Sequence, residues 1–174
     1  MAITKVTGAL LGNYTGGSAD DTVVIGDGAG DAITTGTDNT FIGDNAGSAT
    51  TTASNNVAVG SSALLANTTG AANTAVGVDS LKDNTTGANN VAVGENALAN
   101  NTTASQNVAV GQNALLTATT AADNVGIGHD ALRLTTTGGS NIGIGTDALR
   151  ANTTGNNNVA VGYNSLVANT TGIE

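Results

Sequence analysis

NVAVGENALANNTTASQ, residues 90–106, is one copy of a 17-residue unit that fills most of the chain. A glycine closes the opening N-V-A-V-G segment of each copy, and a Thr-Thr pair follows that glycine eight residues later. The glycines are Gly26, Gly43, Gly60, Gly77, Gly94, Gly111, Gly128, Gly145 and Gly162. Nine copies run from Thr22 to Glu174 without insertion or deletion. A period of this length is typical of a solenoid, in which each repeat forms one coil and stacks on the next.

We number the positions of the unit one to seventeen, starting at Asn90. Positions two to four form a short β-branched segment, position five is glycine, and N-T-T-G at positions twelve to fifteen has turn chemistry. A helix is excluded because glycine and β-branched residues fill the unit and its apolar spacing is not helical. The sequence predicts an all-β fold, a parallel β-solenoid or β-roll of nine turns over 22–174. Residues 1–21 break the repeat and are predicted to be an N-terminal cap or attachment segment.

Three columns are expected to organise the coil. Valine, isoleucine or threonine at positions two and four lies on one face of the strand, since strand side chains alternate. Leucine at position nine supplies a second inward anchor, and glycine at position five suits a positive φ. Asparagine occupies position one in all copies but the first, which has Thr22. Asparagine tolerates left-handed backbone and can form amide ladders between stacked copies.

Position three faces away from the valine and isoleucine columns and is small and uncharged along most of the chain. It includes Ala58, Ala75, Ala92, Ala109 and Ala160. A strand face exposed to water should carry polar groups there, so this column predicts close packing against a neighbouring chain. The expected assembly is an intertwined or side-packed homotrimer. The alternative is a monomeric solenoid with an alanine stripe on its surface.

The motif N-V-A-V-G, with its variants N-V-G-I-G and N-I-G-I-G, resembles the head repeat of trimeric autotransporter adhesins. The 17-residue form with A-L-x-x-N-T-T-G resembles repeats of phage and other viral tail fibres, and the opening M-A-I-T-K-V-T-G is similar to the start of phage fibre proteins. The resemblance covers residues 22–174. It implies a left-handed parallel β-roll assembled from three chains, and a place on a virion or an extracellular surface.

The two ends of the chain carry a second assembly hypothesis. The N-terminal segment is apolar and rich in β-formers, including Ile3, Val6 and Leu10. It is expected to bind other virion or filament proteins, or to complete the sheet of a neighbouring subunit. The repeat ends without a cap, and open strand edges favour pairing with another chain. End-to-end polymerisation is therefore expected.

Composition excludes several other functions. The formal net charge is −9 with only four Lys and Arg residues, which argues against binding to nucleic acid or to an anionic membrane surface. Cysteine is absent and His129 is the single histidine, so no transition-metal site is expected. Asp27, Asp31 and Asp44 form a weak calcium candidate, read more simply as solvated acids. No cofactor and no enzymatic activity are expected.

Two repeated motifs have alternative interpretations. The N-x-T sequences at Asn13, Asn67, Asn84, Asn101, Asn152 and Asn169 are by-products of the turn motif rather than glycosylation sites. The Thr pairs could form an ice-binding array, although adjacent residues on an extended segment face opposite ways. The sequence thus predicts a structural fibre or filament subunit that assembles with copies of itself. An adhesin head that binds a host receptor is the first alternative, and an ice-binding solenoid is the second.

Overall fold

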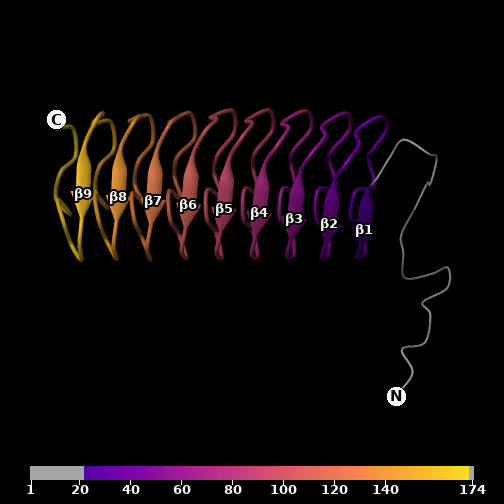
Figure 1. The fold of residues 1–174 in the computed structure, drawn as a ribbon, viewed down its shortest axis with the longest axis horizontal. Coiled ribbons are helices and arrows are strands. Elements are labelled where there is room, and N and C mark those ends of the chain that lie inside the picture. Colours follow the sequence, from indigo (N-terminus) through magenta and orange to yellow (C-terminus); the bar gives the residue numbers. More distant parts are fainter. Residues whose placement is uncertain (1–21, 173–174) are drawn as a thin grey trace, which may run out of the picture.

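The computed structural model describes residues 22–172, which form nine short strands and no helix. The coils stack into a rod, with the strands side by side along one side of it (Figure 1). The strands are β1 (Val23–Ile25), β2 (Thr40–Ile42), β3 (Val57–Val59), β4 (Thr74–Val76), β5 (Val91–Val93), β6 (Val108–Val110), β7 (Val125–Ile127), β8 (Ile142–Ile144) and β9 (Val159–Val161). Their order in the sheet is the order of the chain. This confirms the predicted parallel β-solenoid with its 17-residue turns.

Every strand pairs in parallel with the next strand at a constant register of one repeat. Val91 lies beside Val108, for example, and Val93 beside Val110. Backbone hydrogen bonds also join successive turns outside the strands, as from Leu98 N to the Ala114 carbonyl (3.0 Å). The backbone of an internal turn is therefore bonded to both neighbouring turns. This satisfies polar groups that a thin coil could not satisfy alone.

The glycine at position five is required by both conformation and space. Its φ lies between 124° and 139° in all nine turns, which confirms the expected positive φ. A Cβ at Gly94 would lie 2.6 Å from the carbonyl oxygen of Gly111, the glycine of the next turn. No side chain fits there unless the two turns move apart.

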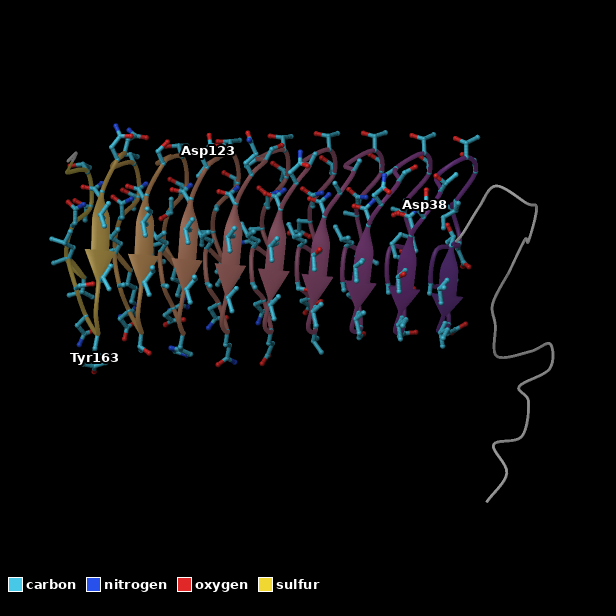
Figure 2. The ribbon with its side chains drawn as sticks, viewed as in Figure 1. Asp38, Asp123 and Tyr163 are labelled. Atoms are coloured by element: carbon cyan, nitrogen blue, oxygen red, sulfur yellow. The ribbon has the colours of Figure 1, made fainter. Side chains whose placement is uncertain are left out.

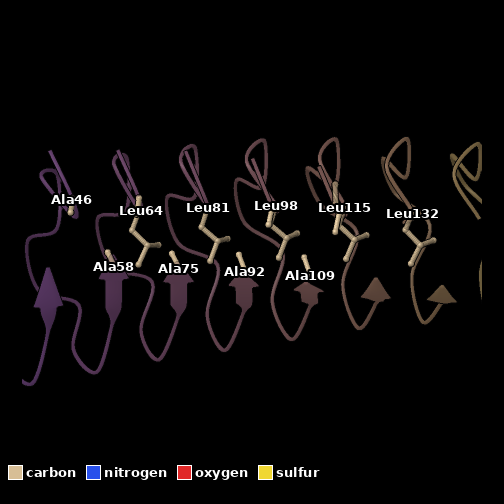
Figure 3. Packing of buried hydrophobic residues seen from close by; sticks show 14 of the residues in the cluster. Ala46, Ala58, Leu64, Ala75, Leu81, Ala92, Leu98, Ala109, Leu115 and Leu132 are labelled. Atoms are coloured by element: carbon tan, nitrogen blue, oxygen red, sulfur yellow. The ribbon is translucent and has the colours of Figure 1, made fainter. Parts of the chain in front are cut away.

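The core of the rod is a double column of alanine and leucine. The alanines of position three lie on the strands and point inward, toward the leucines of position nine on the opposite side of the coil (Figure 3). Ala58, Ala75, Ala92 and Ala109 are 0% exposed within the single chain, as are the six position-nine leucines from Leu64 to Leu149. The prediction of inward leucines is confirmed. The prediction that position three faces out of the coil is wrong.

The strand points the opposite face into the coil from the one that the sequence predicted. Position three lies inside, so positions two and four lie outside, as the burial pattern of β3 (Val57 and Val59 half-buried around a buried Ala58) illustrates. The reason is the narrow interior of the coil. With a leucine on one wall, only a methyl group or a hydrogen fits opposite it, because protein interiors are close-packed. A Cβ at Gly126 would already lie 3.3 Å from a Leu115 side-chain carbon.

The first two turns fill the same interior in a different way. They carry Val24 and Phe41 at position three, and glycines instead of leucine at position nine. Phe41 is fully buried. A Cβ at Gly47 would lie 2.7 Å from the Phe41 ring, so the ring occupies the space that leucine fills in later turns.

A continuous amide ladder runs through the rod at position one. From Asn56 to Asn158, each backbone N–H donates to the side-chain Oδ1 of the asparagine one turn earlier, at 2.9 to 3.0 Å. Most of the Nδ2 groups donate to that same oxygen and also to a backbone carbonyl, as Asn90 does to the carbonyl of Ala104 (2.9 Å). The predicted asparagine ladder is confirmed.

Left-handed backbone occurs one residue before the ladder, at position seventeen, and also at positions seven and nine. Position seven is mainly Asn, Asp or Ser, residues that tolerate this conformation. Position nine is unusual because leucine occupies it, with φ between 47° and 53° from Leu64 to Leu166. Left-handed backbone costs about 1–2 kcal/mol for a residue with a Cβ. Burial of leucine, worth about 1.5–3 kcal/mol, offsets that cost.

Candidate interaction surface

The outward side chains of the sheet form the principal surface feature of the rod. We call them the Val/Ile face, defined as positions two and four of the nine strands. Sixteen of its eighteen residues are valine or isoleucine, and the others are Thr40 and Thr74. The apolar members are Val23, Ile25, Ile42, Val57, Val59, Val76, Val91, Val93, Val108, Val110, Val125, Ile127, Ile142, Ile144, Val159 and Val161.

These side chains are accessible to solvent along the whole rod. Seven of them are at least 36% exposed, up to 67% for Val161, and the rest are half-buried. They form one continuous apolar patch over nine neighbouring strands, whereas a soluble monomer usually exposes no more than a few hundred Å² as one such patch. The face carries no charged residue. An uncharged, flat, apolar surface of this size is typical of a protein contact.

Two polar edges border the Val/Ile face. The upper edge, with Asp38 and Asp123, is position seventeen, and the lower edge, with Tyr163, is position six (Figure 2). By the repeat, Asp27 and Asp44 belong to the lower edge in the first two turns. These turns contain no Lys or Arg, so one end of the bordered face is acidic and the rest is nearly neutral.

The residues predicted to mediate assembly divide into two groups. Ala58, Ala75, Ala92, Ala109 and Ala160 are at most 4% exposed, because their own chain encloses them. The prediction that they touch a neighbouring chain is therefore wrong. The neighbouring valines and isoleucines on the same strands take their place as the accessible apolar group. Ile3, Val6 and Leu10 lie outside the described residues.

The calcium candidates do not come together as a site. Asp27, Asp31 and Asp44 are all exposed, and within residues 22–172 no group of three or more acidic or histidine side chains is arranged to hold a metal ion. Asp27 and Asp44 share a column, and the Asp44 carboxylate accepts a hydrogen bond from Asn45 Nδ2 (3.1 Å). Their geometry is that of separate surface acids.

Ion pairs form at a place that sequence reasoning missed. Asp130, with its side chain 10% exposed, lies 3.5 Å from Arg133 Nη1 and 3.8 Å from Arg150 Nε, and accepts a hydrogen bond from Asn113 Nδ2 (3.0 Å). Arg150 Nε also lies 3.5 Å from Asp147 Oδ1. These contacts join turns six, seven and eight on the side of the coil opposite the sheet.

The sequence does contain a signal for these pairs. Within 22–174 the basic residues Lys82, Arg133 and Arg150 all occupy position ten. Position seven is aspartate in the same three turns (Asp79, Asp130 and Asp147) and is Asn, Ser or Gly in the other six. Each such pair lies within 3.7 Å. His129, half exposed, lies 4.0 Å from Asp130 Oδ1 and is a surface residue at the edge of this cluster.

The Thr pairs separate into two unlike columns. The first threonine of each pair donates its hydroxyl to the backbone carbonyl of the threonine one turn later, at 2.9 to 3.3 Å along the rod. The second threonine is exposed. The hydroxyls of the first threonine column therefore bond successive turns together, and only the second threonine column faces solvent.

The asparagines of the N-x-T sequences are structural where the burial is clear. Asn67, Asn84, Asn101 and Asn152 are 0% exposed. Asn84 Nδ2 donates to Asn67 Oδ1 (2.9 Å) and Asn101 Nδ2 to Asn84 Oδ1 (2.7 Å), a second and shorter ladder at position twelve. Ala118 interrupts it, and Asn101 Oδ1 is left buried without a partner. Asn13 lies outside the described residues.

No known protein family, curated protein or solved structure matches this chain. Within the described residues, no helix is long and apolar enough to span a membrane. The surface geometry therefore carries the functional argument.

Proposed function

We propose that this chain is a structural subunit of a fibre or filament, a rigid rod that associates with copies of itself. One observation carries the proposal: nine turns stack without interruption, with a side-chain ladder and a backbone ladder running along the same axis. Each turn bonds to its two neighbours, so bending would strain many hydrogen bonds together. The polar side chains of these columns are used for stacking rather than gathered at a pocket.

The proposed setting is a virion appendage or an extracellular surface filament, by resemblance to tail-fibre and adhesin-head repeats. End-to-end stacking of rods, with residues 1–21 joining a neighbouring subunit or other virion or filament proteins, belongs to the same proposal. An open strand edge favours pairing with another chain, which would support such contacts at the end of a stack.

Electron microscopy and solution scattering of the purified full chain test the structural role. We expect a straight particle whose repeat region is about 40 Å long, since each turn adds about 4.8 Å. Deleting residues 1–11 should shorten or abolish longer filaments while leaving that rod intact. A compact, flexible or unfolded particle would contradict the proposal.

The two alternatives are decided by separate assays. An adhesin head would bind host cells as the isolated protein, whereas a purely structural subunit would not. An ice-binding solenoid would show thermal hysteresis. The single outward column of threonine, with the other column bonded to carbonyls, favours the structural role over ice binding.

A further inference from the structure

The Val/Ile face has the size and chemistry of one half of a stable protein interface. Its eighteen residues, with the two edges beside them, correspond to the roughly 20–30 residues that each partner contributes to an interface of standard size. Charged residues, which are depleted at interface cores, are absent from it. We propose that two copies of this chain pack through their Val/Ile faces with the rods antiparallel, so that β5 of one copy faces β5 of the other.

The shape of the face favours a second copy as its occupant. Two flat sheets pack face to face at about 10 Å, with side chains of the two inner faces interdigitating. The face repeats at the spacing of its own strands over nine turns at a constant register. A copy of the same chain presents that same spacing and can therefore match it at every turn, which an unrelated surface does not. This inference rests on the proposed structural role, since it supplies the lateral contact of the subunit.

The apolar contacts alone do not choose an orientation, because all turns present nearly the same side chains. The charged edges make the choice. In parallel, in-register packing, the upper edge of one copy borders the lower edge of the other at the same turn. Asp38 of one copy would then lie near Asp27 and Asp44 of the other, with no basic residue in these turns. A parallel trimer, as in the adhesin heads that the repeat resembles, also gathers these acids at one end.

Antiparallel packing separates the acidic ends. Turn one then lies opposite turn nine, and each edge borders the same edge of the other copy. Asp27 would lie opposite Tyr163, and Asp44 opposite Thr146, so neither meets a like charge. The only acid facing its own copy is Glu95 in the central turn, which already accepts a hydrogen bond from Gln112 Nε2 (2.9 Å).

A pair of double variants tests the orientation. In the antiparallel dimer, Ile42 on β2 faces Ile144 on β8 of the other copy. Ile42→Asp/Ile144→Lys therefore forms two opposite-charge contacts, whereas in parallel packing position four faces position two, so the aspartate faces Thr40 and the lysine faces Ile142 of the other copy, without an opposite charge. Ile42→Asp/Ile144→Asp is the matched control, since it places like charges together in the antiparallel dimer and leaves each charge without an opposite partner in parallel packing. Sedimentation equilibrium at low ionic strength measures the association of both variants and of the unmodified chain.

We expect the unmodified chain and the Asp/Lys variant to be dimers, and the Asp/Asp variant to associate more than about 100-fold more weakly, because like charges in a contact are strongly unfavourable. Equal weakening of both variants, a trimeric mass, or a monomeric unmodified chain would overturn the inference. Circular dichroism and electron microscopy of the variants show whether the rod itself persists. Rods that associate only end to end contradict the dimer alone, whereas loss of the rod, or of all self-association, contradicts the proposed function.

A distance measurement gives an independent readout. The chain has no cysteine, so Thr40→Cys provides a single spin-label site on the Val/Ile face. In the antiparallel dimer the two labels lie six turns apart, about 30 Å, whereas parallel packing places them about 10 Å apart. Thr74→Cys is the control, because it lies one turn from the centre and gives a short distance in both arrangements. A short distance from Thr40 would exclude the antiparallel dimer.

Discussion

The first two turns and turns three to six fill the same interior with side chains in opposite places. The large side chain lies on the strand in the first two turns and on the opposite wall in the later ones. In the later turns the strand contributes alanine and the opposite wall contributes leucine, as for Ala92 and Leu98. In turn two the strand contributes Phe41 and the opposite wall contributes Gly47. The backbone is the same in both regions, with φ of 59° at Gly47 and 53° at Leu64. The difference shows that the coil specifies the sum of two facing side chains rather than the residue at either position.

The largest expected effect comes from breaking this compensation in turn two. Phe41→Ala should lower the free energy of unfolding by about 3–5 kcal/mol, because Gly47 leaves the resulting cavity empty. Gly47→Leu alone should cost about 1–3 kcal/mol by overpacking against the ring. The double variant Phe41→Ala/Gly47→Leu recreates the alanine and leucine pair of later turns and should recover most of the loss. Denaturant unfolding followed by circular dichroism measures the cycle, and additive losses would contradict the compensation.

The asparagine ladder offers a second comparison between the middle and the start of the rod. Asn90→Ala removes the acceptor of the Asn107 N–H (3.0 Å) and the donor to the Ala104 carbonyl (2.9 Å). The Ala104 carbonyl keeps its bond from Asn101 Nδ2 (3.0 Å), so the loss comes mainly from the buried Asn107 N–H left unpaired, which should cost about 1–3 kcal/mol. Thr22→Ala in the first turn loses only the longer contact from Asn39 N (3.3 Å) and should cost no more than about 1 kcal/mol. Equal losses in denaturant unfolding would indicate that the ladder is incidental.

Repairing the second ladder should stabilise the rod. Ala118→Asn places a donor beside the unpaired Asn101 Oδ1, and it places an acceptor in the column of the unpaired Thr135 hydroxyl. The expected gain is about 1 kcal/mol in the free energy of unfolding. Ala118→Val is the control, since it adds similar bulk without a hydrogen bond. If the two variants unfold alike, the gain does not come from the ladder.

The smallest expected effect distinguishes the ion pairs of Asp130 from an exposed acid in the first turn. Asp130→Asn removes the ion pairs to Arg133 and Arg150 while keeping a residue that tolerates the local φ of 57°. It should cost no more than about 1 kcal/mol, since both arginine side chains are at least one-third exposed. Asp31→Asn in turn one, an exposed acid, is the control and should change little. Added salt should reduce the difference, and a difference that persists in high salt would point to packing instead of charge.

Much of the fold follows from the period. The spacing of glycine and of Thr-Thr fixed the number and length of the turns, because any slip would place a side chain where Gly94 meets Gly111. The inward leucines and the asparagine ladder also followed, since a residue repeated at one position must stack on itself. These inferences depend only on the regular 17-residue spacing, which can be read directly from the sequence.

The inward side of the strand could not be derived in the same way. Either face of a three-residue strand can point into the coil. The sequence prediction placed the larger side chains inside, which assumes a wide core. The interior is narrow because leucine fills it from the other wall. The pairs Val24 with Gly30 and Phe41 with Gly47 were the available signal, since residues that exchange volume between turns must face each other. That error moved the predicted contact surface from alanine to the valine and isoleucine beside it.

The left-handed leucines had no such signal. Leu98 has φ of 51°, a conformation that its side chain does not favour. The next turn makes this conformation stable, because it packs against the Leu98 side chain and its Ala114 carbonyl accepts a hydrogen bond from the Leu98 N–H. Local preference and tertiary packing conflict at this residue, and packing prevails.

The constant register between neighbouring strands makes the rod a molecular ruler. Its length rises by one strand spacing, about 4.8 Å, for each repeat present, and every repeat offers the next the same surface. A gain or loss of 17 codons in the gene would therefore lengthen or shorten the rod by one turn. The contacts between the remaining turns would stay the same.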